Sequence, residues 1–178
     1  MLKNLLLSMI LPVALALPLS VSAQEAVPEH PGVSADMQTF VLRERLDADG
    51  LPVLDDQGKP VIDTVPVAEE SVVPGDEISY VITVKNLGEA IEGMDMSFDV
   101  SPELSLITGS VTSSIHAEFG FSTGDDIGTV LPLLADGEGN PSDEFSAVGP
   151  DEVIRLHAAI PAVAEGETFT LSYNLNVR

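Results

Sequence analysis

The sequence contains no cysteine and no tryptophan, and aromatic residues make up only 4% of its 178 positions. Without cysteine the chain can form no disulfide, use no thiol in catalysis and carry no lipid on a cysteine. Because aromatic side chains are scarce, a folded core must consist mainly of valine, isoleucine, leucine and methionine. A chain of this length can bury such a core in one domain without covalent cross-links.

Basic residues are also scarce: 7 lysines and arginines against 29 aspartates and glutamates give a formal net charge of −22. Nucleic acids are bound through clusters of lysine and arginine, so we expect no nucleic-acid partner. An anionic membrane surface is disfavoured for the same reason. An acidic surface favours solubility, and clustered carboxylates also suit divalent cations.

Long hydrophobic runs are missing except at the start of the chain. Residues 1–4 carry a positive charge, residues 5–17 form an apolar run interrupted by Pro12, and Val21-Ser22-Ala23 matches a cleavage site of small residues. A membrane-spanning helix needs about 20 apolar residues. We therefore predict a signal peptide over residues 1–23, removed on export, rather than a retained anchor. The mature protein is expected in the periplasm, outside the cell or at the cell surface, with no transmembrane segment after cleavage.

The chain after the signal begins with a polar stretch. Residues 24–36 contain two prolines and few large apolar residues, which predicts a flexible exported arm. Residues 37–46 place Phe40, Leu42 and Leu46 on one parity. This pattern predicts the first strand, with a short helix as the alternative.

A short repeat follows in residues 47–63, where the spelling D-x-x-G-x-P-V-[LI] occurs twice with an eight-residue period. Each copy joins a turn to a short apolar run, which is typical of consecutive hairpin tips. Pro52 and Pro60 cannot donate a backbone hydrogen bond, so we expect edge strands or a projecting ribbon here.

The clearest strand lies in residues 73–88. Pro74-Gly75-Asp76 has the composition of a turn, in which we expect Gly75 to adopt a positive φ. The apolar side chains then alternate on one face: Ile78, Tyr80, Ile82 and Val84. Residues 86–88 close the strand. This spelling predicts a sheet with one buried face and one wet face.

The same alternation returns later in the chain. Residues 91–100 place Met94, Met96 and Phe98 on one face, and residues 152–160 alternate in the same way. The final strand alternates without error through Phe169, Leu171, Tyr173, Leu175 and Val177. Residues 165–167 resemble residues 75–77, which suits one core strand in each of two packed sheets.

Between these strands, residues 122–151 are rich in glycine, aspartate, glutamate, proline and serine. We expect a long acidic loop or a decorated hairpin there, and no helix of ordinary length anywhere after the signal. The sequence as a whole predicts an all-β protein, an Ig-like antiparallel β-sandwich over residues 37–178.

The run from Val73 to Gly88 resembles a repeat of bacterial surface proteins, usually written PGD-x-x-x-Y-x-I-x-V-x-N-x-G, the domain of unknown function 11. Residues 98–104, 106–110 and 161–177 resemble further segments of that Ig-like repeat. The motif positions in this chain are Gly75, Asp76, Tyr80, Asn86 and Gly88. The resemblance implies a secreted or surface-exposed sandwich with a structural or adhesive role and no catalytic residue to carry over. Leu87, Glu89 and the acidic segment 122–151 depart from the pattern, and the chain holds one copy where family members often have arrays.

One catalytic spelling is present. Gly120–Gly124 matches G-x-S-x-G around Ser122, and Asp125 and His157 follow in the order of an α/β-hydrolase triad. That motif works where a strand turns sharply into a helix, and residues 125–128 do not begin a helix. We therefore expect a chance match and no enzyme, with a serine hydrolase acting through Ser122 as a remote alternative.

Calcium is the stronger site hypothesis, because Ca²⁺ takes six to eight oxygen ligands from acidic loops. The candidate ligands form two clusters in sequence: Asp47, Asp49, Asp55 and Asp56, and then Asp136, Glu138, Asn140 and Asp143. Neither cluster matches an EF-hand loop, since Leu51 and Pro52 stand where that motif needs a ligand and a glycine. The alternative is that these aspartates cap turns without an ion.

Zinc and copper are less expected than calcium. His116 and His157 are two histidines without a third ligand, which makes a poor zinc site. Met94 and Met96 share the inward parity of Phe98, so we expect core packing rather than copper binding.

We therefore expect a non-catalytic structural or interaction module, secreted or periplasmic, without a cofactor, whose partner is a protein or the cell surface. The alternative is a Ca²⁺-dependent binding or adhesion module that uses the acidic loops.

Overall fold

The computed structural model describes residues 32–69, 71–124, 126–134 and 140–178. The predicted signal peptide and most of the predicted arm lie outside these ranges. None of the helices formed by the described residues is long and apolar enough to cross a membrane.

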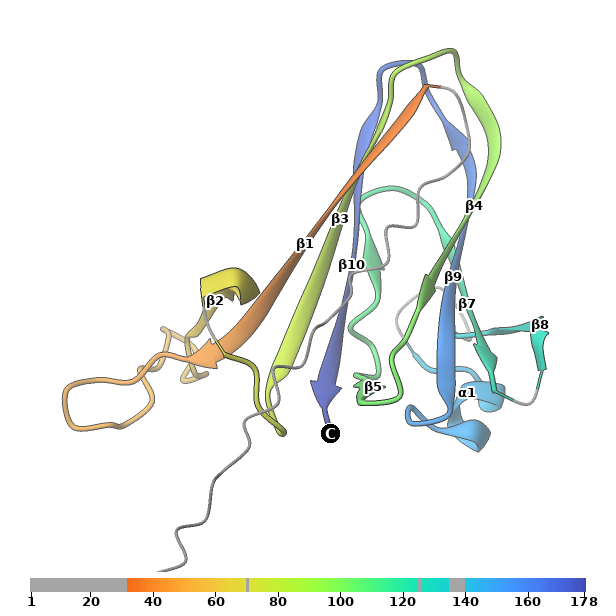
Figure 1. Cartoon of the computed structure of the whole chain (residues 1–178). Helices are drawn as coiled ribbons and strands as arrows, with labels where there is room; N and C mark the ends of the chain where they lie inside the picture. Colours follow the sequence, from red (N-terminus) through yellow and green to blue (C-terminus); the bar gives the residue numbers. More distant parts are fainter. Residues whose placement is uncertain (1–31, 70, 125, 135–139) are drawn as a thin grey trace, which may run out of the picture.

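Two antiparallel sheets pack face to face, as Figure 1 shows. The first has the order β2-β1-β3-β10-β5, with β6 also pairing with β10. Its strands are β1 (Val33–Glu44), β2 (Ile62–Pro66), β3 (Glu77–Asn86), β5 (Leu104–Leu106), β6 (Thr112–Ser113) and β10 (Thr168–Val177). The second has the order β4-β9-β7-β8 and consists of β4 (Ile91–Asp99), β7 (Glu118–Thr123), β8 (Asp126–Pro132) and β9 (Val153–Val163). The predicted all-β sandwich is confirmed.

The alternating residues of β3 and β10 are buried as predicted, but their placement in two facing sheets is wrong. β3 and β10 are neighbours in one sheet, with Ile82 opposite Leu171 and Tyr80 opposite Tyr173. The two tyrosine rings stack with their centroids 5.2 Å apart. Alternation shows only that one face of a strand is covered, so it cannot distinguish neighbouring strands from facing ones.

The facing layer of the core comes from the second sheet. Its buried side chains are Met94, Met96 and Phe98 of β4, Phe121 of β7, and Leu156, Ala158 and Ile160 of β9. Met94 and Met96 are 1% and 5% exposed, so they are core residues.

The turn before β3 is a type II turn. The Asp76 N–H donates to the Val73 carbonyl over 3.1 Å, and Gly75 at its third position has φ 95°. The predicted positive φ is confirmed. The Gly75 N–H also donates to the Val177 carbonyl, which ties the turn to the end of β10.

Strand β1 begins earlier than predicted. It starts at Val33, within the segment for which an arm was expected, and ends at Glu44. Pairing with β3 makes it a strand, since Val33 lies opposite Asn86, whereas its own residues 33–36 have no strong apolar pattern. Its one fully buried side chain is Val41, on the parity opposite to Phe40.

The described part of residues 122–151 forms a decorated hairpin. β8 pairs back onto β7 as a hairpin, and the short helix α1 (Asp143–Val148) follows. The Ser142 hydroxyl caps α1 by accepting the Phe145 N–H, and the Phe145 ring packs edge-on against Phe121 with centroids 5.5 Å apart. A helical turn of residues 67–69, η1 (Val67–Glu69), follows β2 in the other sheet.

Candidate functional site

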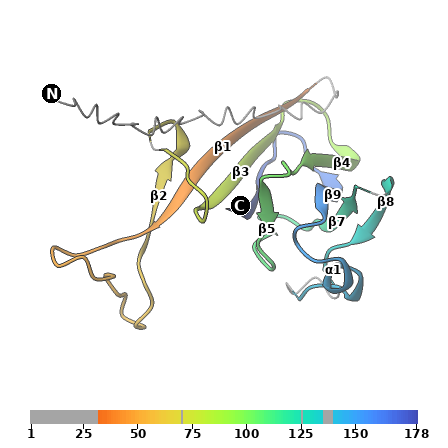
Figure 2. The same ribbon diagram turned by 60° about the horizontal axis from the view of Figure 1, so that its bottom comes forward.

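Residues 45–62 form a ribbon that projects from the end of β1 and returns to β2 (Figures 1 and 2). Three backbone hydrogen bonds close it into a ring. The Arg45 N–H donates to the Val61 carbonyl over 2.8 Å, the Val61 N–H to the Val53 carbonyl over 2.8 Å, and the Val53 N–H to the Arg45 carbonyl over 2.7 Å. The predicted projecting ribbon is confirmed.

The two repeat copies form the same turn. Asp47 Oδ1 accepts the N–H groups of Asp49 and Leu51 over 2.9 and 3.0 Å. Asp55 Oδ1 accepts two N–H groups at the equivalent positions, each over 2.8 Å. Gly50 supplies the positive φ, here 80°, that closes such a turn. The spelling D-x-x-G thus specifies a carboxylate-capped turn that fixes the ribbon.

The repeat has a third, incomplete copy that the sequence reading missed. Arg45, Val53 and Val61 are eight residues apart and make equivalent bonds in the ring. Each is followed by a large apolar residue and an aspartate, which at the third position is Asp63. The Arg45 guanidinium binds this carboxylate from Nε over 3.1 Å and lowers the pKa of Asp63 by hydrogen bonding. The sequence does contain a sign of this third copy: a large apolar residue followed by an aspartate recurs every eight residues.

The ribbon exposes large apolar side chains. Of the eight such side chains exposed in the described residues, four lie in the ribbon: Leu46, Leu51, Leu54 and Ile62, at 57%, 62%, 57% and 48% exposure. Three of them, Leu46, Leu54 and Ile62, follow the three ring residues and so occupy equivalent positions. Single exposed leucines are common on proteins, but here half of those found in the described residues lie in one short segment.

The predicted calcium ligands of the first cluster are exposed in the ribbon turns. Asp47 and Asp55 each direct one oxygen to their own turn, and Asp49 and Asp56 are exposed. Within the described ranges, no group of three or more histidines, aspartates or glutamates is placed to hold a metal ion. Turn capping accounts for Asp47 and Asp55.

The second predicted calcium cluster is only partly described. Asp136 and Glu138 lie outside the described residues. Asn140 is exposed, and Asp143 is in the first turn of α1. Calcium binding at this cluster therefore stays a prediction.

Ser122 of the G-x-S-x-G spelling is fully buried and has two partners. Its Oγ lies 2.8 Å from the Thr129 carbonyl oxygen and 2.9 Å from His157 Nε2. Because a carbonyl oxygen can only accept, the single hydroxyl proton goes to Thr129 and His157 must donate from Nε2. A general base needs an unprotonated nitrogen at that position. The contact therefore joins β8 and β9 to β7.

The surroundings of this pair agree with a structural role. β7 continues into the hairpin with β8 and not into a helix, as the sequence predicted. Partial burial, and secondarily the Arg155 charge, lower the pKa of His157. The lowered pKa favours the neutral form of the His157 imidazole. Asp125, the third predicted triad residue, lies outside the described residues.

Two of the motif residues implied by the family resemblance hold the ends of β3. At its start, the Asp76 carboxylate binds the Arg43 guanidinium through both oxygens and accepts the Val73 N–H over 2.8 Å. At its end, the Asn86 amide donates to the carbonyls of residues 89 and 164 over 2.8 and 3.0 Å and accepts the Gly88 N–H over 3.0 Å. These contacts are structural, and they join turns that lie far apart in the sequence.

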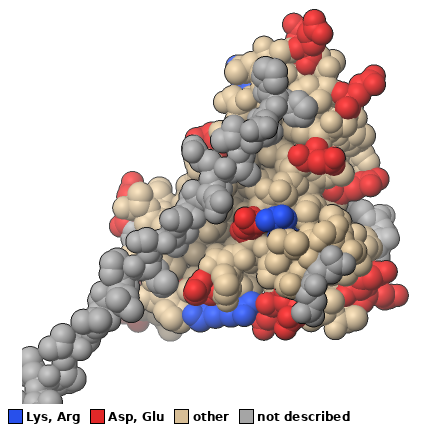
Figure 3. Space-filling view, turned by 45° about the vertical axis from the view of Figure 1, so that its right-hand side comes forward, with Lys and Arg blue, Asp and Glu red and all other residues tan. Residues whose placement is uncertain are grey.

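Acidic side chains are spread over the face drawn in Figure 3, where few basic ones appear. Each arginine forms an ion pair with a carboxylate: Arg43 with Asp76, Arg45 with Asp63, Arg155 with Asp99, and Arg178 with Asp151. Acidic residues nevertheless outnumber basic ones by 29 to 7. The field around the molecule is therefore strongly negative.

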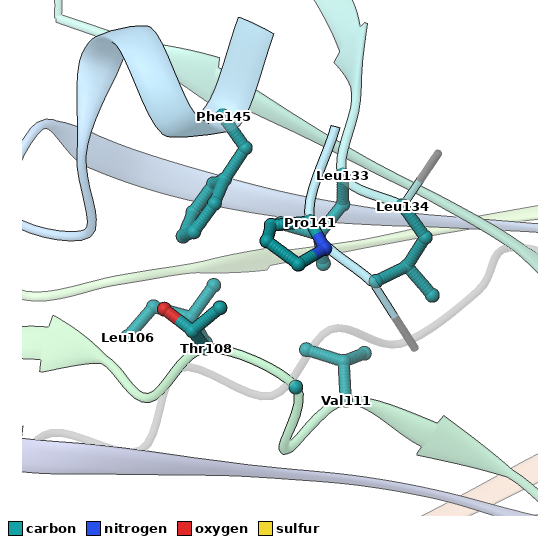
Figure 4. A pocket seen from close by; sticks show the side chains of 8 residues that line it. Leu106, Thr108, Val111, Leu133, Leu134, Pro141 and Phe145 are labelled. Atoms are coloured by element: carbon teal, nitrogen blue, oxygen red, sulfur yellow. The ribbon is translucent and has the colours of Figure 1, made fainter. Parts of the chain in front are cut away.

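A small hollow lies between the end of β5 and α1 (Figure 4). Its wall is mostly apolar and includes Leu106, Val111, Leu133, Leu134, Pro141 and Phe145. The cavity inside it has a volume of only about 10 Å³. Small-molecule sites usually measure about 300–1,000 Å³ and carry several convergent polar groups. A space of this size holds one water molecule at most, so it does not indicate a small-molecule site.

No family model, no curated protein and no solved structure matches this chain.

Proposed function

We propose that this chain is an exported, non-catalytic interaction module that uses the ribbon, residues 45–62, to contact a protein or cell-surface partner. The observation that carries the proposal is the concentration of exposed apolar side chains on a segment whose backbone is held by capped turns and a hydrogen-bonded ring.

Burial energetics support a contact at this place. Moving a leucine side chain fully out of water contributes about 1.5–3 kcal/mol, and the isolated chain leaves Leu46, Leu51 and Leu54 more than half exposed. A fixed backbone reduces the entropy lost on binding. Charged residues at the turns, such as Asp49, Asp56 and Lys59, would form a polar rim around an apolar centre.

The buried position of Ser122 and its bond to the Thr129 carbonyl support the non-catalytic part of the proposal. If Ser122→Ala abolished an ester-hydrolysing activity of the purified protein, the serine-hydrolase alternative would replace the non-catalytic proposal.

The proposal of export is based on residues 1–23 of the sequence. N-terminal sequencing of the exported protein should find a start near Gln24.

The test of the ribbon is site-specific photo-crosslinking in the producing cell, with the photoreactive residue at Leu51. Ile127 on β8 is the matched control, because it is also exposed, at 52% against 62%, and lies on the other side of the molecule (Figure 1). We expect a discrete adduct from Leu51 and none from Ile127. Adducts of equal yield from both positions would contradict the proposal.

The calcium-dependent alternative makes a different prediction for the same experiment. If the acidic loops bind Ca²⁺, millimolar Ca²⁺ should raise the melting temperature, because a ligand of the folded state stabilises it. The Leu51 adduct should then disappear in a chelator. Our proposal predicts an adduct that survives the chelator.

A further inference from the structure

The first seven residues of β1, residues 33–39, form an unpaired edge of the first sheet. β2 pairs with β1 only from Phe40 to Glu44, and β3 lies on the other side of β1 along its length. No other strand within the described ranges pairs with residues 33–39. We call this segment the β1 edge.

The direction of the free backbone groups follows from two bonds at the ends of β1. The Gly32 carbonyl accepts the Leu87 N–H, and the Arg45 N–H donates to the Val61 carbonyl on the β2 side. Because successive residues of an antiparallel strand direct their backbone groups to opposite sides, even-numbered residues of β1 bond β3. The N–H and C=O groups of the odd-numbered residues 33, 35, 37 and 39 therefore point to the β1 edge.

The other sheet edges in the described structure carry features that block pairing. β4 has Glu92, Asp95 and Asp99 and a glycine with φ 78°. β8 contains a glycine and ends in Pro132, β2 has five residues and ends in Pro66, and β5 and β6 have three and two residues. Charges, prolines and short length are the usual protection against strand addition. The β1 edge has one charged residue, Asp36, and no proline.

We propose that the β1 edge binds an extended, positively charged segment of another polypeptide, which adds as a strand in line with β2. Charge complementarity selects this occupant. The chain carries a net charge of −22 with its arginines already paired, so it attracts a cationic segment. A second copy would bring two strongly negative molecules and two Asp36 side chains together.

The side chains along the β1 edge suit such a strand. Ala35 and Met37 share the parity of the buried Val41 and lie opposite Val84 and Ile82 of β3, yet Ala35 is exposed and Met37 half-buried. Alternate apolar residues of an added strand would pack beside them and extend the inner face of the sheet. This surface is separate from the ribbon, so the inference goes beyond the proposed function.

Hydrogen exchange measured by NMR on the full exported chain tests the open edge directly. In the free protein the N–H groups of Ala35 and Met37 should exchange rapidly, whereas those of Asp36 and Gln38, which face β3, should be protected. The probe is the peptide Lys-Val-Lys-Val-Lys-Val-Lys, which should protect Ala35 and Met37 on binding. Protection of Ala35 and Met37 in the free protein would overturn the proposal, because the edge would already be occupied by the chain or a second copy.

Two controls test whether the peptide binds through backbone pairing. Ala35→Pro removes an outward N–H and leaves the bonds to β3, so it should weaken peptide binding about tenfold or more without changing the melting temperature. Gln38→Pro, which removes a bond to β3, should destabilise the fold. Should Ala35→Pro itself fail to fold, the same peptide N-methylated at alternate residues should bind about tenfold more weakly to the unmodified chain.

Binding that is unaffected by both Ala35→Pro and N-methylation would overturn strand addition. Equal binding of Glu-Val-Glu-Val-Glu-Val-Glu would overturn the cationic occupant. Either failure leaves the Leu51 adduct intact, so it is distinguishable from a failure of the ribbon proposal.

Discussion

Buried polar side chains at the two ends of β3 hold turns that the hydrophobic core alone would leave loose. Asn86 is 1% exposed and satisfies its whole amide through bonds to two turns. Asp76 bonds Arg43, 33 residues earlier in the chain. The sequence motif includes both residues, but it did not predict that Arg43 is the partner of Asp76. The two residues are 33 positions apart and come together only because β1 pairs with β3.

The ion pair of Asp76 should make stability depend on pH. Hydrogen bonds from Arg43, followed by the bond from Val73, hold the pKa of the Asp76 carboxyl below its usual value. The stabilisation is therefore complete above the unfolded pKa of about 3.9 and is lost as the pH falls through the lower folded pKa. Asp76→Asn should cost about 1–3 kcal/mol at neutral pH.

Urea unfolding of the native chain and of Asp76→Asn at several pH values checks this prediction. The difference in the free energy of unfolding should be largest near pH 7 and should shrink as the pH falls below about 4. A difference that is the same at both ends of the range would show that the charge of Asp76 contributes nothing.

Gly75 tests the type II turn. Valine at a positive φ is strongly disfavoured, and a Cβ at Gly75 would meet no atom within 4 Å, so any loss comes from the backbone angle. We expect Gly75→Val to destabilise the fold by about 1–3 kcal/mol in a denaturant melt. Gly124→Val is the control, since Gly124 is equally open but has no positive φ, and it should change stability by less than about 0.5 kcal/mol.

At the level of elements, alternation predicted the strands β3, β4 and β10 and their buried faces, because a half-buried strand must alternate. It did not predict that β3 and β10 are neighbours, which depends on where the connections run. It also missed the first residues of β1, whose strand conformation comes from pairing with β3. The third copy of the ribbon repeat was missed as well, because Asp63 in this copy binds the Arg45 side chain and does not cap a turn. Of the candidate site residues, Asp47 and Asp55 cap turns, which was the alternative that the sequence offered to calcium binding.

The neighbouring positions of Ile82 and Leu171 give a prediction about the first sheet. Truncating either to alanine should cost about 2–5 kcal/mol through lost burial and the cavity left behind. Because the two side chains lie opposite each other, the double variant should deviate from additivity by about 0.5–3 kcal/mol. Denaturant melts of the three variants measure this coupling.

Thr83→Ala on the outer face is the control and should cost less than about 0.5 kcal/mol. If Thr83 and Ile82 lost equal stability, the outer face of the sheet would have to be covered as well. Strict additivity of Ile82→Ala and Leu171→Ala would contradict the direct pairing of β3 with β10.

At the scale of the whole molecule, a stable sandwich carries two features that its own stability does not require. One is the ribbon, whose leucines remain in water. The other is the β1 edge, whose backbone groups lack a strand partner in the described structure. Both lie on a molecule with a net charge of −22, which is why we propose a more basic partner rather than a second copy.

The most direct test of the central claim separates binding by the ribbon from stability. In a variant with Leu46, Leu54 and Ile62 replaced by serine, the melting temperature should stay within a few degrees of the native value, because these side chains are about half exposed or more. The photo-crosslinked adduct from Leu51 should disappear in the same variant. An adduct that persists, or a variant that no longer folds, would show that the exposed ribbon is not the contact surface.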